Sequence, residues 1–238
     1  MANKNQRRGP RRKPVSRKRR PAPRSARSAR AHRAAGPPAA PAAAPAAAFD
    51  PFTAFPPAPP PQDDPRDLEP RTIPFGGRPH VVRPLGAADE SRLISFFNSH
   101  TAETIRQRYG YHISEMTPER ARRLVGVDQS RDLALGVFER APDGEEVMHA
   151  VGRYLIDADG RTAEMAFVVR ESKRRLGICT ALLRFLLRVA RHRGLNHLYA
   201  QVQADNAAML ACFRSHGGRI KPILGTDTLE VFVPTAQP

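Results

Sequence analysis

The sequence predicts an α+β domain, a mixed central sheet flanked by helices, that follows a long disordered N-terminal tail. Three observations predict this fold class. Basic residues and prolines are concentrated at the start of the chain, periodic apolar segments begin only near Pro79, and strand-like and helix-like segments then follow one another to the C-terminus. We therefore divide the 238 residues into a tail, residues 1–72, and one domain, residues 79–235, which is long enough to bury a core.

The tail carries nearly all of the net charge of +16. Residues 1–33 contain fourteen Lys or Arg and no Asp or Glu, whereas the rest of the chain has 25 basic and 23 acidic residues. Sixteen of the 24 prolines lie before Arg71. Such a segment buries too little apolar surface to offset the entropy lost on ordering. We expect residues 4–33 to be available for contact with a polyanion, and the alternative is a tail that only solubilises the protein.

Several classes of protein are disfavoured. No segment approaches the ~18 consecutive apolar residues of a membrane span. The first 33 residues lack the apolar core of a secretory signal, and their prolines disfavour the amphipathic helix of a transit peptide. We expect a cytoplasmic protein without a transmembrane segment. Cys179 and Cys212 are expected to be reduced core thiols, and the eight histidines show no ligand spacing, so no metal site is predicted.

The first half of the domain shows alternating strand and helix signals. Asp89 is expected to cap a helix, and Thr117 followed by Pro118 marks another helix start. Asp-Gly turns separate the later strands. The expected elements are a strand at 80–84, helices at 89–97, 101–108 and 117–125, and strands at 133–140, 147–156 and 163–170.

The second half begins with a long helix from Gly177 to about Arg193, which ends at Gly194. Its apolar residues form one stripe and its arginines the opposite face, as expected for a helix packed on a sheet. Asp205 is expected to cap a second helix that ends at Gly217. The remaining expected elements are strands at 198–202, 220–224 and 229–233.

Residues 167–180 carry the strongest chemical signal. A buried-looking strand passes through a basic loop into a helix that has glycine in its first turn. The free N–H groups of a helix start suit a diphosphate, and Lys173, Arg174 and Arg175 add positive charge. Gly177 allows close approach of the backbone. The alternative is a charged loop that precedes an ordinary helix.

The motif Arg174-x-x-Gly177-x-Cys179 resembles the acyl-CoA signature of the GNAT N-acetyltransferases. The run from Asn206 through Met209, Cys212 and Phe213 to Gly217 resembles the second CoA-side motif of that family. The resemblance covers residues 79–235, so a GNAT-like sheet is the expected fold. The start Val82-Arg83-Pro84, the Asp-Gly turns and the segment 163–169 are similar to the acetyltransferase domain of bacterial protein-lysine acetyltransferases.

The resemblance implies acetyl-CoA as cosubstrate and no metal. Phe167 and Val169 would offer backbone hydrogen bonds to the pantetheine arm, and Asn206 would steady the CoA side of two splayed strands. Cys179 is larger than the Gly or Ala of the family and is expected to hinder the phosphates. The residues implied in binding are Phe167, Val168, Val169, Arg174, Arg175, Leu176, Gly177, Ile178, Cys179, Thr180 and Asn206.

Glu164 is the candidate general base. An attacking amine must lose a proton, and strand alternation sets Glu164 on the face opposite Met165 and Phe167, where apolar neighbours would raise the pKa of its carboxyl group. The resembling subgroup has a glutamate base here. Phe213 stands where many members have a tyrosine acid. Tyr199 and Tyr111 are candidate substitutes, and a packing role is the alternative for both.

The sequence therefore predicts an acetyl-CoA-dependent N-acetyltransferase whose acceptor is a protein lysine. Two alternatives stay open: acetylation of a small-molecule amine, and a catalytically weak CoA-binding module that its basic tail tethers to a polyanion. The sequence does not separate the acceptors, because the acceptor pocket is expected in the variable region 93–127.

Overall fold

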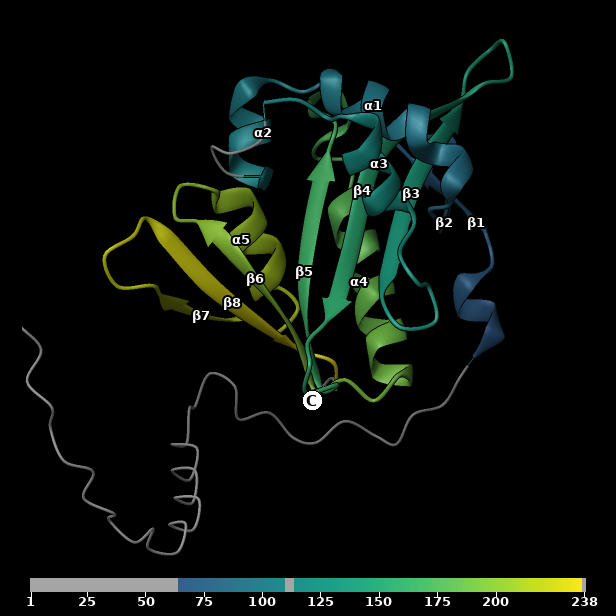
Figure 1. Ribbon diagram of the computed structural model, residues 1–238. Helices are drawn as coiled ribbons and strands as arrows, with labels where there is room; N and C mark the ends of the chain where they lie inside the picture. The colour runs from purple at the N-terminus through teal and green to yellow at the C-terminus, as the bar shows by residue number, and fades with distance from the viewer. Residues whose placement is uncertain (1–63, 110–113, 237–238) are drawn as a thin grey trace, which may run out of the picture. The chain divides into compact units, whose positions relative to one another are not determined.

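The computed structural model describes residues 64–109 and 114–236, which form one mixed sheet with helices on both faces (Figure 1). The described strands lie in the order β1-β2-β3-β4-β5-β6-β8-β7, and all neighbours are antiparallel except β5 and β6. The strands are β1 (Arg71–Phe75), β2 (Arg78–Pro84), β3 (Leu133–Arg140), β4 (Glu146–Ile156), β5 (Thr162–Val169), β6 (His197–Gln203), β7 (Arg219–Pro222) and β8 (Thr228–Pro234).

The helices cover the sheet in two layers, each with its own core. On one face α4 and α5 pack with Met165 and Phe167 of β5, and on the other α1 and α3 pack with Val168. The helices are α1 (Glu90–Asn98), α2 (Ala102–Tyr109), α3 (Pro118–Val125), α4 (Ile178–His192) and α5 (Ala207–Arg214), with 3-10 turns η1 (Pro65–Leu68), η2 (Ala87–Asp89) and η3 (Glu171–Lys173). The alternation expected along β5 is therefore confirmed.

The apolar stripe expected on α4 is buried along its whole length. The stripe residues Ile178, Leu182, Phe185, Leu186 and Val189 are at most 6% exposed. Burial of each such side chain stabilises the fold by about 1.5–3 kcal/mol, so α4 fixes the loop that precedes it. Among the described residues, no helix has both the length and the apolar character needed to cross a bilayer.

The first strand lies in a segment that the sequence analysis assigned partly to the tail. β1 pairs with β2 through a turn at Gly76 and Gly77, which have φ angles of 58° and 77°. The assignment of residues 64–72 to the tail was wrong. Pro74 and the two glycines resemble the composition of the tail, but proline is tolerated on an edge strand such as β1. At the other edge, Leu224, expected in a strand, lies beyond the end of β7 and is 93% exposed.

The two parallel strands β5 and β6 pair over only three residues. The register runs from Thr162↔His197 to Glu164↔Tyr199, and the strands then diverge (Figure 1). β4 continues to pair with β5 as far as Val169. Beyond Glu164 the other edge of β5 has no neighbouring strand among the described residues, so its backbone groups on that side are available to another partner.

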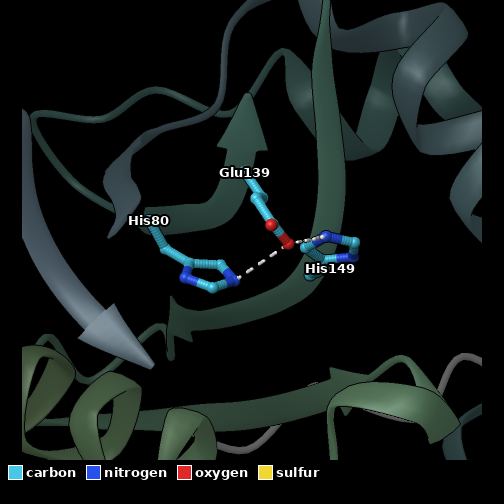
Figure 2. A group of neighbouring side chains, drawn as sticks. All are labelled: His80, Glu139 and His149. Carbon is cyan, nitrogen blue, oxygen red and sulfur yellow. Dashed lines mark hydrogen bonds and ion pairs between the residues drawn. The ribbon is translucent and has the colours of Figure 1, made fainter. Parts of the chain in front are cut away.

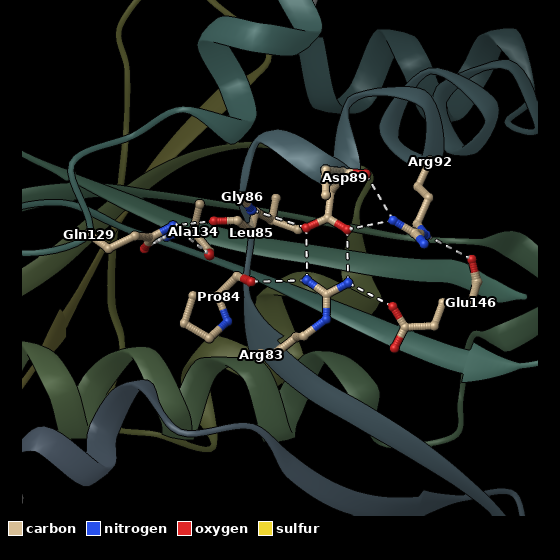
Figure 3. A network of polar contacts seen from close by, with 10 residues as sticks. Arg83, Pro84, Leu85, Gly86, Asp89, Arg92, Gln129, Ala134 and Glu146 are labelled. Carbon is tan, nitrogen blue, oxygen red and sulfur yellow. Dashed lines mark hydrogen bonds and ion pairs between the residues drawn. The ribbon is translucent and has the colours of Figure 1, made fainter.

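A buried ion pair fixes α1 to the sheet (Figure 3). Arg83 of β2 donates two hydrogen bonds of 2.8 Å to Asp89, which is 1% exposed, and a third of 2.8 Å to Glu146 of β4. The Gly86 N–H also donates to Asp89, at 3.0 Å. Burial raises the pKa of Asp89, but the hydrogen bonds from Arg83 and Gly86 outweigh it, so the net shift is downward.

Two helix caps differ from those that the sequence predicts. The Asp89 side chain makes no cap hydrogen bond at α1, because its oxygens are taken by Arg83, Arg92 and Gly86. The cap of α5 is Asn206 rather than Asp205, since the Asn206 side chain accepts from the Met209 N–H at 3.2 Å.

The Asp89→Ala variant should lose about 3 kcal/mol of unfolding free energy, because it leaves a half-buried guanidinium without its bidentate partner. Urea unfolding followed by circular dichroism measures this loss. Glu119→Ala is the matched control, since its pair with Arg123 is 3.7 Å long and exposed, and it should cost less than about 1 kcal/mol. Equal losses in the two variants would contradict the role given to Asp89.

Candidate functional site

A cavity of about 790 Å³ opens where β5 and β6 diverge. It is bounded by the end of β5, the loop before α4, the first turn of α4, and residues of α2 and α5. The lining residues are Thr104, Gln107, Arg108, Phe167, Val168, Val169, Glu171, Ser172, Lys173, Arg174, Arg175, Gly177, Ile178, Cys179, Thr180, Asn206, Ala208, Met209 and Cys212. We call this the large cavity.

The backbone of the loop before α4 is shaped to present N–H groups. Arg175 and Gly177 both have left-handed conformations, with φ angles of 62° and 81°. For Arg175 this conformation costs about 1–2 kcal/mol, and strain of this kind is found at binding sites. The first α4 hydrogen bond runs from the Ala181 N–H to the Gly177 carbonyl, so the N–H groups of residues 178–180 have no helical acceptor. These N–H groups are at the place where the sequence predicts an anion cradle.

Polar contacts hold α2 against this loop. The N–H and hydroxyl of Thr101 donate to Glu171 at 3.0 and 3.1 Å, and Arg174 donates to the Thr104 hydroxyl and to the Val169 carbonyl. Burial raises the pKa of Glu171, but hydrogen bonds from Thr104 and Thr101 outweigh it and lower the pKa to about 2. The carboxylate of Glu171 thus stays charged and ties η3 to the start of α2.

Ten of the eleven residues predicted to bind the donor line the large cavity. The exception is Leu176, which is 37% exposed and whose side chain lies against Gly76 of the β1–β2 turn. The sequence analysis missed Thr104, Gln107 and Arg108, which come from α2. No local signal identifies them, since α2 reaches the cavity only through the tertiary contacts of Glu171 and Arg174.

Cys179 of α4 and Cys212 of α5 both line the large cavity and pack against the edge of the core. Both are free thiols and half-buried. Cys179 Sγ lies 3.6 Å from Met209 Sδ, and Thr180 Oγ1 lies 3.7 Å from Cys212 Sγ. A hydrogen bond from Cys179 lowers the pKa of Cys212, and the same interaction together with burial raises the pKa of Cys179.

A second cavity of about 320 Å³ adjoins the first, and Glu164 lines it. The two cavities share Gln107, Arg108, Phe167, Asn206 and Met209. We call this the small cavity. The prediction that Glu164 lies among apolar neighbours is wrong. Its side chain is exposed, and its charge acts on Arg108 and Arg153.

Arg108 stands at the junction of the two cavities. Burial lowers the pKa of its guanidinium, which lies 4.7 Å from the centre of the Tyr109 ring. Its Nε is buried and has no hydrogen-bond partner among the described residues. Because Arg108 lines both cavities, its guanidinium is a cation that a polar group in the small cavity would meet.

The tyrosines considered as acids are placed as follows. The Tyr199 hydroxyl donates to Asp157 at 3.1 Å, and burial together with that contact raises its pKa to about 12. Tyr199 therefore fits the packing alternative. Phe213 is 1% exposed and lies 6.0 Å from Phe167 between ring centres. Tyr111 lies outside the described residues. Tyr109, which the sequence analysis did not consider, lines the small cavity.

Comparison with known proteins identifies the family. The sequence model of the Acetyltransferase (GNAT) family matches residues 93–217, more than half of the chain. The chain belongs to the GNAT acetyltransferase family. A curated acetyltransferase of Pseudomonas aeruginosa is 28% identical over 156 residues, which cover 65% of this chain and 83% of that protein.

Solved GNAT structures share the fold. The GNAT domain of PAT from S. lividans has a TM-score of 0.61 at 24% identity, covering 69% of this chain and 96% of its own. The RimL ribosomal L7/L12 alpha-N-protein acetyltransferase, solved with coenzyme A, has a TM-score of 0.52 at 16% identity, covering 68% and 96%. At these identities the two structures support the fold alone.

As a GNAT enzyme, the protein is an N-acetyltransferase that moves an acetyl group from acetyl-CoA to an amine. The residues present fit such a donor. The unpaired edge of β5 matches a peptide-like arm, and the left-handed turn with its N–H groups matches a diphosphate. The resemblance noted from Arg174, Gly177 and Asn206 is confirmed at the level of the family.

Iodoacetamide should modify Cys212 about tenfold or more faster than Cys179 at neutral pH. Cys212 holds the larger thiolate fraction, and each unit of pKa difference changes that fraction about tenfold. Peptide mass spectrometry after brief exposure of the native protein measures both rates. Faster modification of Cys179 would contradict the assigned direction of the two pKa shifts.

Proposed function

We propose that this enzyme acetylates the side-chain amine of protein lysines, with the donor in the large cavity and Glu164 as general base. The observation that carries the proposal is the position of Glu164, exposed in the small cavity directly beside the large one. An exposed base is accessible to a lysine that remains attached to a folded protein. The RimL enzyme acts on a protein amine, so the GNAT fold accommodates an acceptor of that size.

The donor is proposed to lie along the free edge of β5. Phe167 and Val169 would hydrogen-bond its pantetheine arm, in the manner of an added strand. The N–H groups from Arg175 to Thr180 would hold its diphosphate, and an N–H near Phe167 would stabilise the negative charge that develops on the carbonyl oxygen. Asn206 supports this arrangement by capping α5 on the opposite wall.

Proton transfer is the main chemical task of the protein. A lysine ammonium has a pKa near 10.4 and cannot attack a thioester until it is deprotonated. Glu164 is proposed to accept that proton, directly or through one water. Its carboxylate is exposed, and its charge acts on Arg108 and Arg153.

The leaving thiolate needs no protein acid in this proposal. Phe213 offers no proton, and the Tyr199 hydroxyl is already bonded to Asp157. A thiol pKa near 8.5 means that the CoA thiolate can leave unprotonated at modest cost. The absence of a tyrosine at position 213 therefore slows the reaction without preventing it.

The donor site is tested by titrating the full-length protein with acetyl-CoA in a calorimeter. Binding is expected, and saturating acetyl-CoA should slow alkylation of Cys212 by about tenfold or more, because Cys212 lines the large cavity. Pantetheine, which lacks the diphosphate, should protect less. Absence of binding heat together with unprotected Cys212 would rule out the donor site.

The base and the acceptor class are tested together. Glu164→Gln should bind acetyl-CoA normally and lower turnover by about 10²-fold or more, because the amine loses its proton acceptor. Mass spectrometry of a source-cell lysate treated with acetyl-CoA and either enzyme should show acetyl-lysines that depend on Glu164. Glu145→Gln, an exposed carboxylate in the β3–β4 turn, is the control. Equal turnover in Glu164→Gln would remove it from the mechanism.

One observation favours a small-molecule amine as the second candidate acceptor. The guanidinium of Arg108, in the lining of the small cavity, suits an acceptor that carries a carboxylate close to its amine. Such an acceptor would appear in the lysate experiment as acetylated small molecules without new acetyl-lysines. A cytoplasmic location and a polyanion contact through residues 4–33 stay predictions, and the latter segment lies outside the described residues.

A further inference from the structure

Three buried side chains from neighbouring strands converge at the end of the sheet beside η3 (Figure 2). His80 of β2, Glu139 of β3 and His149 of β4 are 1%, 7% and 7% exposed. One potential ligand atom of each lies within 4.8 Å of the others. The proposed acetyl transfer uses none of them.

A β-bulge gives His149 its place in the cluster. Val137 of β3 faces Ala150 of β4, but the next residue, Phe138, faces Met148, so His149 is the extra residue on β4. A bulge turns the side chain of the extra residue away from the regular alternation. The side chains of His149 and Glu139 thereby meet, with 3.0 Å between His149 Nε2 and Glu139 Oε2.

One ring nitrogen of His80 faces the carboxylate of Glu139. His80 Nδ1 lies 2.8 Å from the Arg78 carbonyl oxygen, which can only accept, so Nδ1 carries the proton in the neutral ring. His80 Nε2 lies 3.5 Å from Glu139 Oε2 and has no hydrogen-bond partner among the described residues. A cation bound to both atoms would give this buried nitrogen the partner that it lacks.

The spacing fits a small divalent ion. Tetrahedral zinc with ligands at about 2.0–2.1 Å sets neighbouring ligand atoms about 3.3 Å apart. The two distances to Glu139 Oε2, 3.0 and 3.5 Å, lie on either side of that value. We propose that His80, Glu139 and His149 form a site for a zinc-class divalent cation, with water as the fourth ligand.

Lys173 holds the cation position when no metal is bound. Its Nζ lies 2.5 Å from Glu139 Oε2, the same oxygen that both histidines face, while Arg78 Nε lies 2.6 Å from Oε1. An ion on Oε2 must displace the Lys173 ammonium but leaves the Arg78 contact in place. Lys173 and the metal are therefore alternative occupants of one site.

This competition links the site to the large cavity, which Lys173 also lines. A displaced Lys173 ammonium would be available to donor phosphates, so metal and acetyl-CoA should strengthen each other's binding. This link rests on the proposed function, whereas the metal site itself does not. The two are measured separately, because metal binding is titrated without acetyl-CoA.

The experiment titrates metal-free, full-length protein with Zn²⁺ by calorimetry and with Co²⁺ by visible absorption. We expect the cluster to bind about one ion per chain. His80→Gln and His149→Gln should each weaken the binding of that ion by about tenfold or more. His192→Gln is the matched control. His192 belongs to the other His–carboxylate group among the described residues, which consists of Asp64, Asp67 and His192. Its replacement should leave the affinity of the His80–Glu139–His149 cluster for Zn²⁺ unchanged.

Lys173→Met keeps the proposal testable if the histidine variants fail to fold. Removing the competing ammonium should tighten Zn²⁺ binding by about tenfold, a gain that misfolding cannot produce. The proposal is overturned if wild type and Lys173→Met bind Zn²⁺ no tighter than the His80→Gln, His149→Gln double variant. It is also overturned if the loss occurs only in His192→Gln.

Discussion

The divergence of β5 from β6 after Glu164 is the constraint on which the rest of the site depends. Were the strands paired to their ends, the backbone of β5 would be satisfied on both edges and no cavity would open in front of α4. The same divergence leaves Glu164, the last paired residue, in the lining of the small cavity, which adjoins the large one. One local loss of hydrogen bonding thus creates the proposed donor edge and positions the proposed base.

The cost of that divergence is offset by contacts on both sides of the opening. α4 buries its apolar stripe against the sheet, and α2 is held by Glu171 and by Arg174. On the far wall, Asn206 caps α5 and Phe213 packs with Phe167. The loop before α4 is therefore shaped by the protein itself, and a left-handed Arg175 can be maintained without a ligand.

Features that depend on local periodicity were predicted from the sequence, and features that depend on distant contacts were not. The stripe of α4, the Thr117 cap of α3, which accepts from the Arg120 N–H, and the alternation along β5 follow from spacing alone. β1 was missed because Pro74 and its glycines resemble the tail. The exposure of Glu164 was missed because strand alternation specifies a face of the sheet but not what covers that face. The contributions of α2 are set by side chains about 70 residues away in sequence.

The structure also indicates which groups can balance the negative charge of a diphosphate at the proposed site. The sequence presents Lys173, Arg174 and Arg175 as three adjacent cations. Lys173 is bonded inward to Glu139, and Arg174 is bonded to Thr104 and to the Val169 carbonyl, which leaves only the exposed Arg175 side chain outside these contacts. Complementarity to a diphosphate must therefore come mainly from main-chain N–H groups and the α4 dipole. The basic side chains act first as ties that hold the loop, and Lys173 would add its charge to the diphosphate site only if the proposed metal displaced it from Glu139.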